Sequence, residues 1–227
     1  TGTCHRGNSY EVTLRYPSQS LIHMVRETDT FFFIGTGLPA ILSGRDVIGI
    51  AFTGSGKSLA FVLPMIMASM MEEKRMPLEG GEGPVGLILC PSRELARQTH
   101  EVIEGFTVEF HKQGMAEMRI MLCIGGIDGR ADMDTVRDKG MHMVTATPGR
   151  LKDHLNRKRM NLDICKFLVM DEADRMVDLG FEEDIRGTAA WAFQNQAARR
   201  LPALFECATR DVCSIASTRD ACSTVLY

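Results

Sequence analysis

Short apolar runs alternate along the middle of the chain with longer segments that mix apolar and polar residues. Two of these longer segments, Lys57–Met71 and Arg93–Phe110, have helical character. Strands alternating with helices predict a mostly parallel sheet covered on both faces, a three-layer α/β fold. The runs predict strands at Val47–Ala51, Gly86–Cys90, Arg119–Ile124, His142–Ala146 and Phe167–Met170, with Leu204–Phe205 as part of a sixth.

The two ends of the chain carry a weaker pattern than the middle. Residues 1–37 include the apolar run Phe31–Ile34 but no regular alternation. We therefore expect 1–37 to be a divergent N-terminal segment, 38–212 to form the α/β domain and 213–227 to be a poorly specified tail. The glycine-rich segment Glu79–Pro84 separates a predicted helix from a strand, so we expect a flexible surface loop there.

Composition and charge narrow the class of protein. The 227 residues suit one large α/β domain, and 44% hydrophobic and 24% charged residues are an ordinary globular balance. No apolar run predicts a membrane span or a signal peptide. The seven cysteines lack C-x-x-C spacing, which argues against zinc and disulfide frameworks. Buried, reduced thiols at Cys90, Cys123 and Cys165 would suit the nucleus or cytoplasm.

A glycine-rich loop follows the first predicted strand and opens a helix. Its glycines let backbone N–H groups point inward at phosphate oxygens, and the helix N-terminus adds positive partial charge. Lys57 would contact the β- and γ-phosphates, and the Ser58 hydroxyl would ligate Mg²⁺. The strict pattern has glycine where this chain has Ala51, so an ordinary glycine turn also fits. The predicted ATP-binding residues are Thr53, Gly54, Ser55, Gly56, Lys57 and Ser58.

An acidic segment follows the apolar run Phe167–Met170. A buried strand that delivers acids at its carboxyl end places them at the sheet edge where ligands bind. Asp171 would hold Mg²⁺, and Glu172 would orient and deprotonate the attacking water. The alternative is a solvated acidic helix start, since Asp and Glu favour the first turn. With the glycine-rich loop upstream, the sequence favours Lys57, Asp171 and Glu172 as catalytic residues.

Three further clusters also follow predicted strands. Hydroxyls, glycine N–H groups, helix N-termini and arginine can hold a sugar-phosphate backbone without reading bases, so together they suggest a phosphate-contacting track. Each has a structural alternative as a turn or a helix cap, as for Ser92 at a helix start. The clusters are Pro91–Ala96, Gly125–Gly126 and Thr147–Arg150. The basic run Arg157–Arg159 is interpreted as a solvated helix end without a role.

The order of these motifs resembles that of DEAD-box RNA helicases, over about residues 38 to 186. The strings AFTGSGKS, PSRELARQ, CIGG, TPGR and DEAD occur in the family's order, and the longer string DEADRMVDLGFEEDIR is similar to the Abstrakt-like subgroup. The resemblance implies the first RecA-like domain of such an enzyme, with Ala51 as the family's own form of the loop. It implies RNA-backbone contacts from Ser92, Arg93, Gly126, Thr147, Gly149 and Arg150. It implies interdomain coupling through Asp174 and Thr209.

The chain also departs from the family pattern. The family's glutamine motif, which reads adenine, would fall near Ile34 and is not there. This chain has Cys207 where the family's Ser-Ala-Thr motif has serine. No segment of the 227 residues resembles the second RecA-like domain with its arginine motif, so we expect this chain alone to hydrolyse ATP slowly or not at all.

The function that the resemblance implies is the ATP-binding domain of an ATP-dependent RNA helicase. It would bind ATP, Mg²⁺ and single-stranded RNA, and would remodel RNA when joined to a second RecA-like domain. One alternative is a non-catalytic nucleotide- or RNA-binding fragment. Others are an unrelated P-loop phosphotransferase and a DNA-directed P-loop helicase, because phosphate contacts are common to both nucleic acids.

Overall fold

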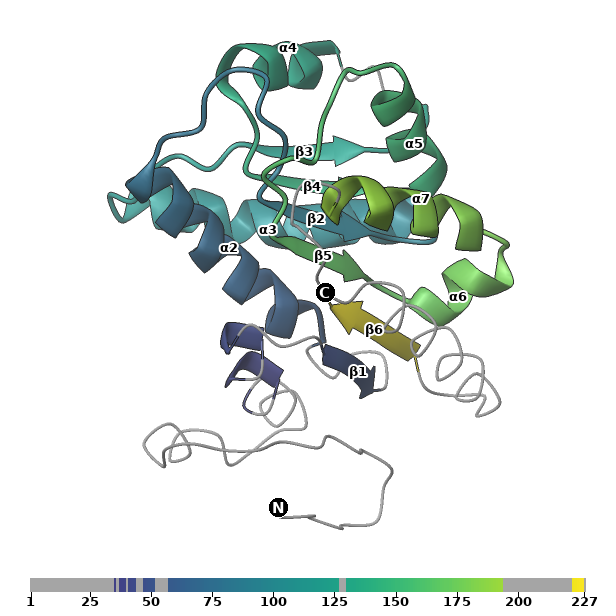
Figure 1. Cartoon of the computed structure of the whole chain (residues 1–227). Coiled ribbons are helices and arrows are strands. Elements are labelled where there is room, and N and C mark those ends of the chain that lie inside the picture. The colour runs from purple at the N-terminus through teal and green to yellow at the C-terminus, as the bar shows by residue number, and fades with distance from the viewer. Residues whose placement is uncertain are drawn as a thin grey trace.

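The fold is that of a computed structural model, which describes residues 35, 37–39, 41–43, 47–51, 57–126, 130–193 and 222–226. Its strands form a six-stranded sheet of order β1-β6-β5-β2-β4-β3 (Figure 1). Five of the six predicted strands are present, each within one residue of the expected bounds. They are β1 (Val47–Ala51), β2 (Gly86–Leu89), β3 (Ile120–Cys123), β4 (Met143–Ala146) and β5 (Phe167–Met170).

The helices follow the strands in the predicted alternation. They are α2 (Lys57–Arg75), α3 (Arg93–Lys112), α4 (Arg130–Lys139), α5 (Pro148–Asn156), α6 (Ala173–Asp178) and α7 (Glu182–Phe193). Strands β5, β2, β4 and β3 pair in parallel, so the prediction of a mostly parallel sheet is confirmed. None of the described helices is long and apolar enough to cross a membrane.

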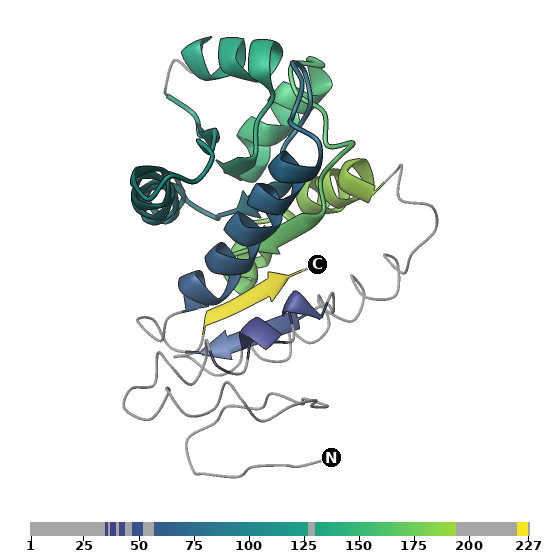
Figure 2. The ribbon, with the colours of Figure 1, turned by 90° about the vertical axis from the view of Figure 1, so that its left-hand side faces the viewer.

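Alternate residues of the strands enter two separate cores, one on each face of the sheet. On one face Leu87, Val144 and Leu168 pack with apolar residues of α4 to α7. On the other face Ile88 and Val169 pack with residues of α2 and α3. Figure 2 shows the resulting layers from the side, with the teal helix α3 on one side of the sheet and the yellow-green helix α7 on the other. The three-layer arrangement follows from this alternation, because both sheet faces are apolar.

The last strand departs from the prediction of a poorly specified tail over 213–227. Residues Cys222–Leu226 form β6, which lies between β1 and β5 and runs antiparallel to both. Its arrow in Figure 1 points against those of its neighbours. Val225 pairs with both Ile48 and Met170, so β1 runs in the same direction as β5. The sixth strand expected at Leu204–Phe205 lies outside the described residues.

The segment Glu79–Pro84 is more constrained than the flexible loop that its glycines suggested. The Asn161 side chain donates to Gly81 O at 2.9 Å and accepts from Gly83 N at 3.2 Å. A β-carbon at Gly80 would stand 2.5 Å from the backbone oxygen of Arg137. The glycines therefore permit close approach of this segment to neighbouring backbone.

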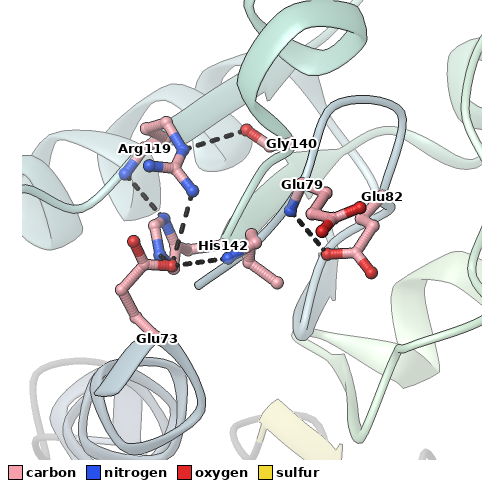
Figure 3. A network of polar contacts seen from close by, with 7 residues as sticks. Glu73, Glu79, Glu82, Arg119, Gly140 and His142 are labelled. Carbon is pink, nitrogen blue, oxygen red and sulfur yellow. Dashed lines mark hydrogen bonds and ion pairs between the residues drawn. The ribbon is translucent and has the colours of Figure 1, made fainter. Parts of the chain in front are cut away.

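A polar network joins the end of α2 to the starts of β3 and β4 (Figure 3). His142 is fully buried, and its Nε2 lies 3.0 Å from Oε2 of Glu73. Its Nδ1 accepts from the backbone N–H of Arg119 at 3.0 Å, so Nε2 carries the proton that is donated to Glu73. The Arg119 guanidinium donates to Gly140 O and approaches Glu73. This network lies at the amino edge of the sheet. The predicted site residues follow the strands and lie at the opposite edge.

Candidate functional site

The carboxyl ends of the parallel strands lie level at one edge of the sheet. Leu89 of β2 pairs with Ala146 of β4 and with Met170 of β5, and Ala146 also pairs with Cys123 of β3. Each of these residues is the last of its strand. The segments after the strands, which carry the predicted site residues, therefore begin side by side. Ligands of open parallel sheets bind at this edge.

Lys57 and Ser58 begin helix α2, the first element after β1. Lys57 is the first helical residue and is buried, with 8% of its surface exposed, and Ser58 is half-buried. A buried ammonium group at a helix N-terminus adds its charge to the positive end of the helix dipole. The other predicted loop residues, Thr53, Gly54, Ser55 and Gly56, lie outside the described residues.

Asp171 directly follows β5 and is buried, with 4% of its surface exposed. Its backbone N–H donates to Leu89 O at 2.9 Å, which continues the β5–β2 ladder by one residue. Burial raises the pKa of the neighbouring Cys90 thiol, and the negative charges of Asp171 and Glu172 raise it further. Cys90 is therefore a neutral thiol beside the acidic pair. Cys90, Cys123 and Cys165 are all buried, as the sequence predicts.

Glu172 adopts a left-handed backbone conformation at the start of α6, with φ of 53° and ψ of 50°. This conformation is rare outside glycine and often marks a functional site. Its carboxylate lies 3.2 Å from the guanidinium of Arg175. Arg175 is missing from the site predicted from sequence, although its i,i+3 spacing from Glu172 is the spacing of helical ion pairs.

Ser92 and Arg93 begin helix α3 beside the Gly125–Gly126 turn. The Ser92 hydroxyl accepts from Leu95 N at 3.2 Å, so it is an N-cap, one of the two alternatives that its sequence left open. The exposed Arg93 side chain lies against the turn, with Nη1 3.3 Å from where a β-carbon of Gly126 would stand. Gly126 has φ of +89°, which favours glycine. The structure thus brings the Pro91–Ala96 and Gly125–Gly126 clusters together.

Thr147, Gly149 and Arg150 lie at the start of helix α5. Thr147 is the N-cap residue, but its side chain makes no capping hydrogen bond. Gly149 is exposed, and a β-carbon there would meet nothing within 4 Å. Arg150 is half-buried. The N-terminus of α5 therefore presents a hydroxyl, an open glycine and a guanidinium at the same sheet edge as Arg93.

Of the two residues predicted to couple domains, the structure describes only Asp174. Asp174 is half-buried in the first turn of α6, close to Glu172 in sequence. Thr209 lies outside the described residues. Within the described part of the chain no three His, Cys, Asp or Glu side chains cluster as a metal site would require. A metal ion at this edge would depend on oxygens from Ser58, Asp171 and its substrate.

The sheet, the acids after β5 and the lysine that opens α2 define the class of this domain. It is a RecA-like α/β domain of the P-loop type. The sequence profile described as "DEAD/DEAH box helicase" matches residues 36–209. The chain belongs to the DEAD/DEAH box helicase family.

Its relatives include plant and insect helicases. "DEAD-box ATP-dependent RNA helicase 35B" of Oryza sativa subsp. japonica is 62% identical over 169 residues, 74% of this chain and 26% of that protein. "ATP-dependent RNA helicase abstrakt" of Drosophila melanogaster is 55% identical over 150 residues, 66% of this chain and 24% of that protein. The predicted resemblance to the Abstrakt-like subgroup is confirmed. The chain spans about a quarter of the length of these relatives.

A solved structure shares the fold. The crystal structure of the yeast DEAD-box splicing factor Prp28 matches with a TM-score of 0.57 and 28% identity. The match covers 76% of this chain and 39% of that one. The prediction of a RecA-like helicase domain agrees with this likeness.

Proposed function

We propose that this chain is the nucleotide-binding domain of an ATP-dependent RNA helicase, which binds ATP with Mg²⁺ and the backbone of single-stranded RNA. The observation that carries the proposal is the alignment of Asp171 and the Arg93 and Thr147 clusters at one sheet edge. Lys57 opens the helix that follows β1, a strand that runs in the same direction as β5. The names of the relatives support RNA as the nucleic acid. Joined to a second RecA-like domain, it would hydrolyse ATP to remodel RNA.

The residues at the edge fit ATP and Mg²⁺ chemically. Lys57 is a buried cation at a helix N-terminus, which suits the β- and γ-phosphates. Asp171 is a buried carboxylate after a parallel strand, and with the Ser58 hydroxyl it offers the oxygen ligands that Mg²⁺ prefers. When bound, Mg²⁺ would neutralise charge on the phosphate oxygens.

Glu172 has the position and the chemistry of a general base. Its left-handed backbone turns the chain between the buried Asp171 and helix α6. A carboxylate there would orient a water molecule for attack and accept its proton.

The RNA-backbone contacts would come from the starts of α3 and α5 and from the turn after β3. Arg93 and Arg150 supply charge, Gly126 and Gly149 allow close approach of a strand, and the Ser92 and Thr147 hydroxyls can donate to phosphate. Because these groups contact phosphates, binding should tolerate different sequences and weaken with salt. The buried cysteines support a location in the nucleus or cytoplasm.

Nucleotide binding with a fluorescent ATP analogue and Mg²⁺ tests the proposal. Lys57→Ala should weaken binding at least tenfold, since it removes the cation at the phosphates. Lys74→Ala, an exposed lysine at the other end of α2, is the matched control and should bind like the parent chain. Equal binding by the Lys57 and Lys74 variants would exclude Lys57 from the phosphate site.

A non-catalytic nucleotide-binding fragment is the second candidate. It is favoured by the Glu172–Arg175 ion pair, which ties up the carboxylate needed as base. Phosphate release with saturating RNA and Mg²⁺, measured on this domain joined to the second RecA-like domain of a relative, separates the two candidates. Turnover that RNA stimulates supports the helicase domain, whereas tight ATP binding without turnover supports the fragment.

A further inference from the structure

A second concave site lies at the amino edge of the sheet, opposite the edge that carries Lys57 and Asp171. Its walls come from the segments that precede β2 and β5, at Gly81 and 160–163, together with the end of α4, the turn after α5 and Trp191. The cavity has a volume of about 480 Å³, within the range of sites that hold a ligand or a few side chains. None of the motifs assigned above reaches it.

Trp191 gives the cavity an apolar surface that faces solvent. It is the one tryptophan of the chain and is 41% exposed, on a helix whose Ile185, Ala189 and Ala192 are buried. Its ring also borders an adjoining hollow lined by Lys152 and Thr188. Partly exposed tryptophan beside a cavity is typical of the residues that anchor protein partners.

The rim of the cavity is positively charged. Lys158 and Arg159 are exposed, and within the described part of the chain neither of them forms an ion pair. Arg137, also on the rim, is instead neutralised by Asp134 and Asp138. The available charge therefore comes from Lys158 and Arg159, the basic run to which the sequence assigned no role.

Lys158 occupies a position that normally favours glycine. Its φ is +52°, and its N–H donates to Leu155 O at 2.9 Å while Arg159 N donates to His154 O at 3.0 Å. These bonds form the helix C-terminal motif in which the left-handed residue is usually glycine. A lysine here adds backbone strain that a glycine would avoid, which the favourable place of a positive charge at a helix C-terminus offsets only in part. The side chain of Lys158 is therefore a candidate for a role beyond capping the helix.

We propose that this cavity binds an acidic peptide segment of a partner protein. An aromatic or aliphatic side chain of the segment would lie against Trp191, and flanking carboxylates would pair with Lys158 and Arg159. Charge complementarity supports an acidic partner, as in other recognition of acidic motifs by basic clusters. A short peptide fits better than a continuous phosphate backbone because only two rim cations, Lys158 and Arg159, lack an acidic partner, and a peptide can place carboxylates beside those two alone and keep uncharged residues near Asp163.

Trp191 fluorescence in the 227-residue chain reads out binding directly, since no other tryptophan contributes. The probe is a synthetic peptide with a central phenylalanine flanked on both sides by aspartates. We expect a saturable change in emission with this peptide, and none with a peptide that has lysines in place of the aspartates. No change with the acidic peptide overturns the proposal. A saturable change with oligouridylate instead would identify a nucleic-acid surface and also overturn it.

Two variants separate ligand binding from folding. Lys158→Glu combined with Arg159→Glu should weaken peptide binding at least tenfold, and Lys74→Glu, on α2, should leave it unchanged. Lys158→Gly relieves the left-handed backbone, so its thermal midpoint should equal or exceed that of the parent chain while its peptide affinity falls. Unchanged affinity in Lys158→Gly and in the double variant would show that the rim charge plays no part and would refute the proposal.

Discussion

The guanidinium of Arg93 lies against the backbone of Gly125, with Nη2 3.1 Å from the position that a β-carbon would take there. The two residues come from different motif clusters and meet because β2 and β3 both flank β4 and end level with it. A side chain at residue 125 would have to displace the guanidinium. The glycine pair after β3 thus sets the position of Arg93.

Gly125→Ala should therefore weaken RNA binding by about threefold to tenfold while leaving the fold intact. The methyl group meets the mobile end of a side chain rather than backbone, so the guanidinium shifts and the turn does not. Fluorescence anisotropy with labelled single-stranded RNA measures the effect. Gly105→Ala, in the exposed middle of α3, is the control and should raise stability by about 0.5–1 kcal/mol without changing RNA binding.

Glu172→Gln is expected to keep ATP binding and to remove turnover. The amide preserves the size of the side chain but cannot accept the proton of the attacking water. Binding of a fluorescent ATP analogue and RNA-stimulated phosphate release measure the two properties separately, in this domain joined to the second RecA-like domain of a relative. A variant that lost ATP binding as fully as Lys57→Ala would contradict the role given to Glu172.

The stability of the domain should decrease on acidification because of the His142–Glu73 pair. Burial, and then the Arg119 charge, hold the pKa of His142 below its ordinary value, although Glu73 opposes this shift. Partial burial acts to raise the pKa of Glu73, but the Leu78 amide, His142 and Arg119 together lower it. The unfolded chain therefore binds protons at higher pH than the folded chain, so the free energy of unfolding falls as pH decreases from about 7.

Urea unfolding at neutral pH and near pH 5.5 measures this slope. His142→Gln should lower stability at neutral pH by about 1–3 kcal/mol, because it disrupts hydrogen bonds to buried partners. It should also reduce the loss between the two pH values. Some slope should remain, since burial and then the Arg150 charge lower the pKa of His154 as well. An unchanged slope in His142→Gln would assign the pH dependence to other groups.

The sequence predicted the strands and their order of alternation because both faces of the sheet are buried. Runs such as Phe167–Met170 must be apolar throughout, and that pattern is visible without a structure. The position of Asp171 and Glu172 at the sheet edge could be predicted from the same pattern, because the residues that follow a buried strand lie at the edge of its sheet. Lys57 could be placed because the glycine spacing before it is specific.

Features that depend on contacts between distant segments could not be predicted in this way. The approach of Arg93 to Gly125 and the attachment of Glu79–Pro84 to Asn161 join residues whose spacing carries no periodic signal. The left-handed backbone of Glu172 depends on tertiary surroundings rather than on residue type. Strand β6 was missed because a strand of five residues carries little pattern of its own.

Truncation after residue 221 should destabilise the domain, because β6 connects β1 to the rest of the sheet. Val225 pairs with Ile48 on one side and Met170 on the other, and within the described residues β1 has no other strand partner. Removing β6 leaves unpaired backbone groups on two strands, and such exposed edges also favour aggregation. Thermal unfolding followed by circular dichroism should show a midpoint lower by several degrees. ATP affinity should fall in parallel, because β1 leads into the segment before Lys57. A truncated chain with the parent midpoint and the parent ATP affinity would mean that β6 does not hold β1 in the sheet.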